Sequence, residues 1–514
     1  MSLLWPILAR AVRTPRRAAI VDDRRTYSCG QVVGGAMFAA EQIEAATGAD
    51  HVAILLPASG AFAMTLLGTW FAGRVAVPLN YLLSRDELNY VIRDCDADTI
   101  VTVPQMIDFI GGVEAIPDGV RLLDLTQIDF TGVPPLRWPP MAGRDRTAVI
   151  LYTSGTSGRP KGVVLTHGNL HSNVDAAIEH ASITQLDTFL GVLPQFHSFG
   201  LTAMTLIPLR AGSKVVYSAK FSPLRRIVEL IRKHRPGIFM AIPSMYGALL
   251  SAKDLTALDL ASIRIAISGA EPLPDAIFEQ YRERFNVHIM EGYGLTETAP
   301  VTNWSTPKRH RLHSVGPSLP GVRVVIVDDE DNVLPPGRDG EILIAGPNVM
   351  AGYYKQPQLT AEAFVDLETG TGQDRGEPRA QRFFRTGDVG HLDHDGFLFI
   401  TGRKKEMLII GGENVFPREI EEVLNKHPSV GSSAVIGQTD TIRGEVPVAF
   451  VEIQDGQEFN ESELRSWCRE NLATFKTPRK ITRVDQLPRN PTGKIMRREL
   501  REESQVASGE SRKS

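Results

Sequence analysis

Between Val52 and Val327, short runs of β-branched and other apolar residues alternate with longer segments of helical pattern. The runs are HVAILLP, SKVVYS, PGIFMAIP, IRIAISGA and VRVVIVDD, and SPLRRIVELIRKHR is one of the segments between them. This alternation predicts parallel sheets covered by helices, because a parallel pair of strands needs a long crossover connection. The chain is therefore expected to have an α/β fold, and its 514 residues are enough for more than one domain.

After about Arg403 the pattern changes to a compact α+β unit that ends near Leu500. We therefore expect an N-terminal domain over residues 1–403 and a C-terminal domain over residues 404–501. The tail, residues 502–514, is expected to be disordered because its polar composition leaves little to bury. The polar, glycine-containing segment from Asp366 to Gln381 is expected to form an exposed loop.

Charge and cysteine content argue against several classes of protein. A formal net charge of −4 gives no electrostatic case for a nucleic-acid partner. The cysteines, Cys29, Cys95 and Cys468, lie far apart, so neither a disulfide framework nor a thiolate metal site is indicated. A reducing cytoplasm is the expected location, and the oligomeric state stays open.

An uncharged stretch from Val52 to Gly73 is long enough to suggest a membrane span, but Pro57, Ser59 and Gly60 interrupt it. We expect a buried strand followed by a buried helix.

The N-terminal sequence MSLLWPILARAVRTPRR places its apolar run before its arginines, unlike a secretory signal. At most it predicts peripheral contact with the inner face of the membrane through Leu3, Leu4 and Trp5. The alternative, which we prefer, is that these residues pack as the first helix of the fold.

The loop YTSGTSGRPKG, Tyr152 to Gly162, is a poor helix and a poor strand because of its glycines and hydroxyl side chains. A loop that exposes backbone N–H groups beside a lysine suits a polyphosphate. It is not a Walker A loop, since Lys161 follows Pro160 and precedes Gly162. Taken alone, it indicates either a phosphate site or a mobile surface loop.

Five motifs in order resemble the adenylate-forming, or AMP-binding, superfamily of acyl-CoA synthetases, peptide-synthetase adenylation domains and firefly-type luciferases. They are YTSGTSGRPKG, EGYGLTE (291–297), FRTGD (384–388), GRKKEMLIIGGENVFPREIE (402–421) and PRNPTGK (488–494). The resemblance extends from about Leu3 to Leu500. It implies a large N-terminal domain of parallel-rich sheets with a β-barrel-like subdomain, a small mobile α+β C-terminal domain, and an active site between them.

The resemblance also implies a nucleotide site. The phosphate loop corresponds to Thr153, Ser154, Gly155, Thr156, Ser157, Gly158 and Lys161, and the adenine contacts correspond to Gly269, Ala270, Glu271, Pro272 and Tyr293. Thr296 would bond the α-phosphate, Glu297 would bind Mg²⁺, and Asp388 and Arg403 would contact the ribose and the nucleotide. EGYGLTE does not fit a dinucleotide fingerprint, because Glu297 replaces the last glycine.

Two further residues are implied to act on the acyl group. His197, in PQFHSFG, resembles the position at the mouth of the acyl channel, and a core histidine is its alternative. Lys494 resembles the lysine that contacts the substrate carboxylate and the α-phosphate, although by charge pattern alone it would be a surface residue. By contrast, HLDHDG, residues 391–396, is interpreted as a turn between two strands rather than a metal site.

The implied reaction has two steps, with a hinge at Lys405 and a CoA-facing surface at Gly411, Gly412 and Glu413. ATP and Mg²⁺ would activate a medium- or long-chain fatty acid as acyl-AMP, and CoA would accept the acyl group. An acyl-acyl-carrier-protein synthetase and a fatty acyl-AMP ligase are alternatives with another acceptor. A non-catalytic nucleotide- or lipid-binding homologue is a third alternative. The sequence has no G-x-S-x-G nucleophile elbow, which fits a route without a covalent enzyme intermediate.

Overall fold

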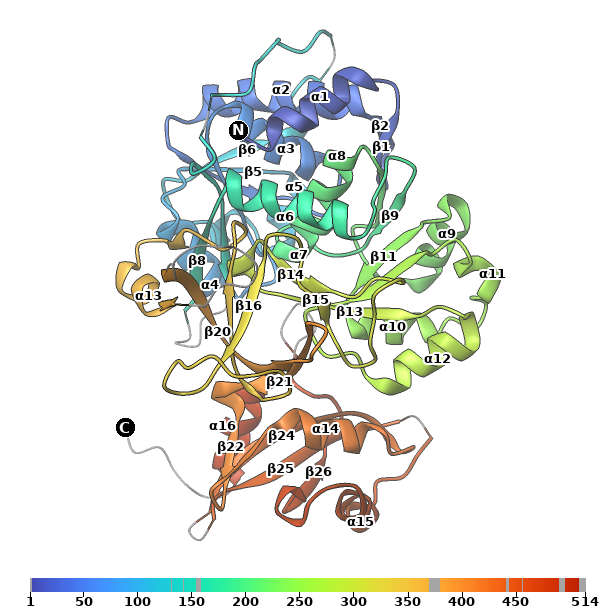
Figure 1. Ribbon diagram of the computed structural model, residues 1–514. Helices are drawn as coiled ribbons and strands as arrows, with labels where there is room; N and C mark the ends of the chain where they lie inside the picture. Colours follow the sequence, from blue (N-terminus) through green and yellow to red (C-terminus); the bar gives the residue numbers. More distant parts are fainter. Residues whose placement is uncertain are drawn as a thin grey trace.

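The computed structural model of the chain describes residues 2–130, 132–141, 143–153, 159–368, 380–440, 443–454, 456–489 and 495–507. Its strands form four sheets, and helices lie against the two larger ones (Figure 1). The expected α/β fold, with a large N-terminal part and a smaller C-terminal unit, is confirmed.

The first sheet has eight strands in the order β14-β13-β12-β11-β9-β10-β1-β2. The pairs from β13 to β1 are parallel, and β14 and β2 add antiparallel strands at the edges. The runs SKVVYS, PGIFMAIP and IRIAISGA form β10, β11 and β12, as predicted. The bounds are β1 Ala18–Val21, β2 Thr26–Ser28, β9 Thr188–Gly191, β10 Lys214–Tyr217, β11 Ile238–Ala241, β12 Ile265–Ser268, β13 Ile289–Gly294 and β14 Val301–Trp304.

The second sheet has seven strands in the order β18-β8-β7-β4-β3-β5-β6, with parallel pairs from β7 to β6 and antiparallel pairs at β8 and β18. HVAILLP forms β3, and eleven of the twelve residues of the following helix α3 are buried, as expected. No described helix is both long enough and apolar enough to cross a membrane. The bounds are β3 His51–Leu55, β4 Val75–Pro78, β5 Thr99–Thr102, β6 Arg121–Asp124, β7 Thr147–Thr153, β8 Lys161–Thr166 and β18 Gly352–Tyr353.

One apolar core joins these two sheets and the helices between them. The N-terminal helix α1 belongs to it: Leu3 and Leu4 have no exposed surface, so membrane contact through these two leucines is wrong and their packing in the fold is confirmed. The helices of this part are α1 Leu4–Arg13, α2 Cys29–Ala46, α3 Gly60–Phe71, α4 Arg85–Asp94, α5 Pro104–Phe109, α6 His167–His180, α7 Ser198–Leu201, α8 Ile207–Ala211, α9 Leu224–His234, α10 Pro243–Leu250, α11 Ala257–Leu260, α12 Asp275–Phe285 and α13 Pro357–Glu362.

The third sheet is antiparallel, in the order β15-β21-β20-β17-β16 with β19 paired to β20. It corresponds to the β-barrel-like subdomain that the resemblance implied. VRVVIVDD forms β16 here. Its expected parallel pairing is wrong, because its neighbour β17 follows it directly in the chain and pairs antiparallel. The bounds are β15 Gly316–Pro317, β16 Arg323–Val327, β17 Gly340–Ala345, β19 Phe364–Glu368, β20 Ala380–Leu392 and β21 Phe397–Arg403.

Two loop predictions fall on this sheet. HLDHDG is the turn between β20 and β21, and the Asp393 carboxylate accepts hydrogen bonds from the backbone N–H groups of Asp395 and Phe397. The segment 366–381 is only partly a loop: its two ends pair as β19 and β20, since Leu367 is buried there. Residues 369–379 lie outside the described residues.

Residues after Lys405 form the fourth sheet, in the order β23-β22-β25-β24 with β26 paired to β25, and it has its own apolar core. This unit lies at one end of the molecule (Figure 1). Helix α16 extends to Ala507, six residues into the segment expected to be disordered. Residues 508–514 are not described. The bounds are β22 Leu408–Ile410, β23 Glu413–Val415, α14 Pro417–Asn425, β24 Val430–Asp440, β25 Gly444–Ile453, α15 Glu461–Asn471, β26 Lys480–Arg483 and α16 Arg497–Ala507.

Candidate active site

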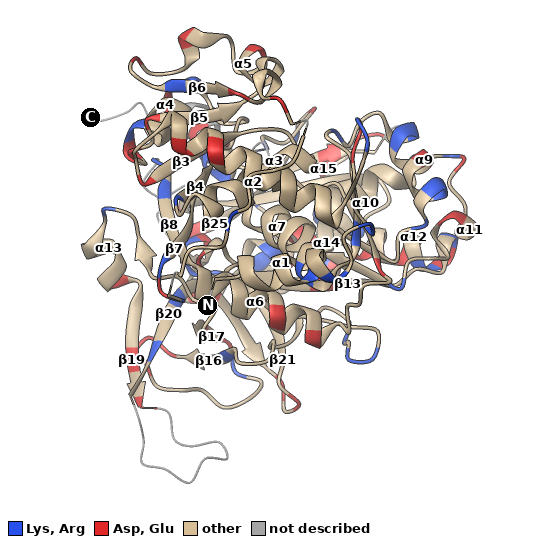
Figure 2. Ribbon diagram, turned by 90° about the horizontal axis from the view of Figure 1, so that it is seen from above, with Lys and Arg blue, Asp and Glu red and all other residues tan. Residues whose placement is uncertain are grey.

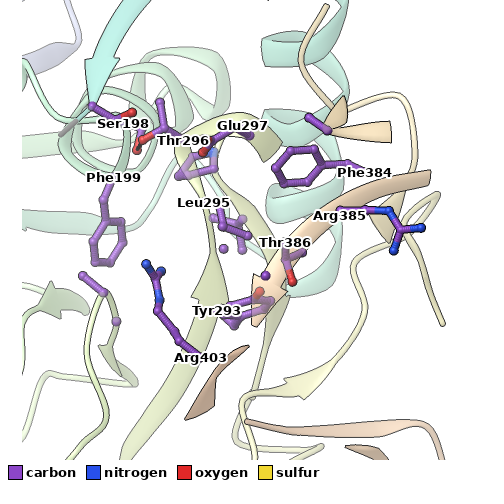
Figure 3. Close-up of a pocket in the computed structure, with 18 of the residues that line it drawn as sticks. Ser198, Phe199, Tyr293, Leu295, Thr296, Glu297, Phe384, Arg385, Thr386 and Arg403 are labelled. Carbon is purple, nitrogen blue, oxygen red and sulfur yellow. Dashed lines mark hydrogen bonds between the residues drawn. The ribbon is translucent and has the colours of Figure 1, made fainter. Parts of the chain in front are cut away.

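A cavity of about 540 Å³ lies where the first and third sheets meet the segment that leads into the C-terminal unit. Figure 3 shows residues from distant parts of the chain around it, among them Ser198, Thr296 and Arg403. Eleven of the residues predicted from the sequence line it: Thr153, Lys161, His197, Gly269, Ala270, Glu271, Tyr293, Thr296, Glu297, Arg403 and Lys405.

The other predicted nucleotide-binding and catalytic residues either do not line the cavity or lie outside the described residues. Asp388 does not line the cavity itself, although its partners Tyr293 and Arg403 do. Pro272 follows the lining segment 269–271 and does not line the cavity. Ser154, Gly155, Thr156, Ser157, Gly158 and Lys494 lie outside the described residues. The hydroxyl of Thr153, at the start of the phosphate loop, is buried and makes no hydrogen bond with the part of the chain that the structure describes. A polar atom in this state has hydrogen-bonding capacity left for a ligand.

The carboxyl ends of β12 and β13 form one wall of the cavity. Gly269 and Ala270 follow β12, and β13 carries Tyr293 at its end. Ligands of open parallel sheets bind at this edge, where loops replace the strands. At Gly294 a side chain has no room, because a Cβ atom would lie 1.9 Å from the carbonyl oxygen of Pro300. The glycine therefore allows the close turn that places Thr296 and Glu297 in the cavity.

Lys161 and Glu297 form an ion pair in the cavity, with 3.3 Å between Nζ and Oε1. Tyr353 joins them: Lys161 donates to its phenol oxygen at 2.6 Å, and the phenol donates to Glu297 Oε1 at 2.9 Å. Burial, with the charge of Glu297, raises the pKa of Tyr353 above its usual value, so the phenol stays a donor. Tyr353, which was not among the predicted site residues, thus holds a lysine and a carboxylate close together.

Replacing Tyr353 with phenylalanine is expected to raise the Mg²⁺ concentration needed for half-maximal activity by about tenfold, because Glu297 loses the neutral donor that orients it. A titration of the expected acyl-AMP-forming activity with Mg²⁺ at saturating ATP measures this. Tyr354→Phe is the matched control, since the Tyr354 hydroxyl donates to Asp96 and Tyr354 does not line the cavity. An equal shift in both variants would contradict a role of Tyr353 in the site.

A second polar group connects β13, β20 and β21. The buried carboxylate of Asp388 accepts a hydrogen bond from the Tyr293 hydroxyl at 2.6 Å and pairs with Arg403 Nε at 3.0 Å. The Asp388 charge raises the pKa of Arg403 above its usual range. An ionised carboxylate accepts hydrogen bonds at both of its oxygens, so Asp388 is of the chemical type that binds hydroxyl groups. Figure 3 shows Tyr293 and Arg403 on the same side of the cavity.

The opposite wall is made by the start of α7. The hydroxyl groups of Ser198 and Thr296 lie 3.2 Å apart (Figure 3). His197 precedes them and accepts a hydrogen bond at Nδ1 from the backbone N–H of Phe199. Burial lowers the pKa of His197 to about 4, so its imidazole is neutral at physiological pH. This state suits a positioning role, as predicted, rather than proton transfer.

The low pKa of His197 predicts a pH-dependent stability. A histidine that titrates near pH 6.5 when unfolded and about 4 when folded binds protons preferentially in the unfolded state between these values. The unfolding free energy therefore falls with pH, by about 2 kcal/mol from this group at pH 5. Denaturant unfolding at pH 7 and pH 5 should show His197→Asn losing that much less than wild type. His394→Asn, at an exposed histidine, should behave like wild type.

The predicted hinge region links the two parts of the chain. Lys404–Glu406 forms a short 3₁₀ turn, and Lys404 pairs with Asp329 at 2.9 Å and with Glu341 at 3.4 Å. From the C-terminal unit, Arg418 donates to the carbonyl oxygen of Ile400 at 2.6 Å. These contacts hold the C-terminal unit against the third sheet. Whether Lys405 is the pivot stays a prediction.

The predicted CoA face is an exposed turn between β22 and β23. Gly411 and Gly412 have φ values of 62° and 91°, which glycine adopts without strain, and a Cβ atom at either would meet nothing within 4 Å. Neither these glycines nor Glu413 line the cavity in this arrangement. The role of this turn stays a prediction.

Comparison with known proteins gives consistent matches over most of the chain. Residues 7–354 match the AMP-binding enzyme family, and residues 419–494 match the AMP-binding enzyme C-terminal domain. The chain is 32% identical to a long-chain-fatty-acid–CoA ligase of Bacillus subtilis (strain 168), over 88% of this chain and 85% of the relative. It is 31% identical to a feruloyl-CoA synthase of an Amycolatopsis species, over 97% of this chain and 98% of the relative. The solved structure of o-succinylbenzoate coenzyme A synthetase from Bacillus subtilis, in complex with ATP and magnesium ion, matches with a TM-score of 0.82. Its identity is 29%, over 96% of this chain and 99% of that one.

Proposed function

From the premise that this chain belongs to the AMP-binding enzyme family, as an AMP-forming acid–thiol ligase, we propose that its carboxylate substrate is a medium- or long-chain fatty acid. ATP and CoA are the co-substrates, and Mg²⁺ is the metal. The observation that carries the choice of acid is the apolar part of the cavity wall, since an alkyl chain gains from burial against such a surface. Its members are Phe199, Ile267, Leu295, Pro300, Val301 and Trp304.

In the first step, a carboxylate oxygen of the acid attacks the α-phosphorus of ATP, and the bond to pyrophosphate breaks. Two negative groups must meet for this to happen, so positive charge is needed at the point of attack. We assign Lys161 to the phosphates and Thr296 to the α-phosphate. Glu297 would hold Mg²⁺, which neutralises phosphate charge when bound. A single buried carboxylate fits this metal, because Mg²⁺ takes most of its other ligands from phosphates and water.

In the second step, the thiol sulfur of CoA attacks the acyl carbonyl carbon, the thiol loses its proton, and AMP leaves. No protein residue becomes acylated. The predicted CoA face lies outside the cavity, so we propose that the unit after Lys405 rotates between the steps and brings Gly411 and Gly412 toward the acyl-adenylate. Asp388 and Arg403 are assigned to the ribose and the nucleotide, from the wall next to that pivot.

The test is to incubate the purified protein with ATP, Mg²⁺ and octanoate, laurate, palmitate or ferulate, with and without CoA, and to identify products by mass spectrometry. We expect acyl-CoA and AMP from the fatty acids, and only when CoA is present. Preference for ferulate would refute the fatty-acid choice. Acyl-AMP that accumulates regardless of CoA would favour an acyl carrier protein as the acceptor.

A further inference from the structure

Exposed apolar side chains are concentrated in one segment far from the active site. Among the described residues, five of the thirteen large exposed hydrophobic side chains fall between Phe130 and Met141. Leu136, Trp138 and Met141 are 80%, 68% and 95% exposed. Clusters of this kind on a water-soluble surface mark interaction sites. The segment is therefore a candidate docking surface.

This segment is held in place rather than detached. Arg137 forms an ion pair with Glu44 of α2 at 2.6 Å, and Pro139 between the exposed residues is buried. The ring of Phe130 contacts Phe38 of α2 edge-on, at 6.1 Å between centroids. The anchored residues thus alternate with the exposed ones, and the apolar side chains are presented outward.

Helix α1 extends the same surface. The Trp138 ring stacks on Trp5 of α1, with 6.2 Å between centroids. On α1, Trp5, Ala9 and Val12 follow one another at helical spacing on the side away from the core, and Val12 is 72% exposed. A surface helix usually carries polar residues on that side. Together, α1 and residues 132–141 form the surface that we call the α1–Trp138 face, at the end of the molecule opposite the C-terminal unit (Figure 1).

Arginines are concentrated in and next to the α1–Trp138 face. Residues 1–17 contain four arginines and no acidic residue, and residues 130–146 contain three arginines and one aspartate. Arg10, Arg13 and Arg137 belong to the face itself, where Arg137 is paired with Glu44, and the others flank it in the sequence. Figure 2 shows where lysine, arginine, aspartate and glutamate lie along the ribbon. Apolar and aromatic side chains beside arginines match an anionic lipid surface, which takes tryptophan at its interface and attracts positive charge.

We propose that the α1–Trp138 face docks the protein on membranes that contain anionic lipids, with Leu136, Trp138 and Met141 inserted among the headgroups. Arg13 and Arg16, both exposed at the end of α1, would face lipid phosphates. The proposal does not depend on which acid the enzyme activates, because the face lies outside the cavity.

The test is sedimentation of the full-length protein with vesicles of pure phosphatidylcholine, or of phosphatidylcholine and phosphatidylglycerol in a ratio of seven to three. We expect binding to the anionic vesicles to be at least about tenfold stronger, and to weaken as salt is raised. Leu136→Ser/Met141→Ser should lower this binding about tenfold, and Arg13→Glu/Arg16→Glu should abolish the preference for anionic lipid. Leu258→Ser/Leu312→Ser, at exposed leucines elsewhere, should bind like wild type.

Each variant should keep wild-type ligase activity on a water-soluble acid, which shows that the fold is intact. Absence of binding to the anionic vesicles, or full binding by Leu136→Ser/Met141→Ser, would overturn the proposal. So would self-association of the wild type in light scattering that the same double variant removes, since the face would then be an interface between copies of the chain.

Discussion

Replacing Glu297 with glutamine is expected to lower the rate of acyl-adenylate formation about a thousandfold. The Glu297 side chain is buried, and its carboxylate is held by the Tyr353 hydroxyl at 2.9 Å and by Lys161 at 3.3 Å. Its backbone carbonyl accepts from Met350 N–H at 2.8 Å, so the residue is fixed from both ends. Glutamine has nearly the same shape but no charge, and it binds Mg²⁺ poorly. The effect is therefore chemical rather than steric.

The measurement is exchange of labelled pyrophosphate into ATP, which reports the first step alone. Glu362→Gln is the matched control, because Glu362 also lines the cavity but is exposed at its edge. Wild-type exchange in Glu297→Gln at every Mg²⁺ concentration would refute the assignment. Partial recovery at high Mg²⁺ would support it, since a weakened site can still be filled by mass action.

The polar groups of the site could be predicted because their motifs are local. Thr296 and Glu297 lie in one short stretch, and Lys161 and Asp388 each lie in another. The motifs do not show which of their side chains contact one another. Asp388 contacts Arg403 because β20 and β21 pair with these two residues opposite each other, and it contacts Tyr293 because the end of β13 lies beside them. Such contacts depend on tertiary packing, which a pattern along the chain does not encode.

Tyr353 shows why a functional side chain can be missed. It stands beside Tyr354 in the sequence, and nothing local distinguishes the two rings. Pairing of β18 with β8, with Tyr353 opposite Val163, sets which of them faces the cavity, because successive side chains of a strand point to opposite faces. Tyr353 therefore reaches Lys161 and Glu297, whereas Tyr354 reaches Asp96.

The fold was predictable where strands are parallel and separated by helices, as for β3, β10, β11 and β12. The run that forms β16 has the same composition, yet it pairs antiparallel with β17. Apolar composition indicates burial, while the direction of pairing depends on whether the connection crosses the sheet or returns along it. Residues 502–507, at the start of the tail expected to be disordered, are helical instead, because Leu500 of α16 is buried in the C-terminal unit and the helix continues past it to Ala507.

Replacing Lys494 with alanine is expected to lower acyl-adenylate formation at least about a hundredfold, and to leave the transfer of a supplied acyl-AMP to CoA nearly unchanged. Lys494 lies outside the described residues, but the residues on both sides of 490–494 are described. Arg489 and Ile495, which flank residues 490–494, pair as an isolated β-bridge. Three residues beyond Lys494, Arg497 pairs with Glu406 at 3.1 Å, next to the cavity-lining Lys405.

The charges that act on Arg497 include that of a cavity residue. Burial alone would lower the pKa of Arg497, but the carboxylates of Glu421, Glu406 and Glu271 raise it above its usual value. Because Glu271 lines the cavity, a side chain that senses its charge is near the site. We therefore expect Lys494, three residues before Arg497 in the sequence, to supply charge to the first step and to leave with the C-terminal unit before the second.

Two assays separate these steps: pyrophosphate exchange for the first, and acyl-CoA formation from synthetic acyl-AMP for the second. Arg498→Ala is the matched control, because Arg498 is exposed on α16 and forms an ion pair with Glu502 of the same helix. Both rates should stay at the wild-type level in this variant. Equal loss of both steps in Lys494→Ala would show that the residue supports the C-terminal unit as a whole. Loss of the first step alone would mean that the Lys494 charge acts in acyl-AMP formation and not in transfer to CoA. A fixed arrangement of the two units would not explain such a difference.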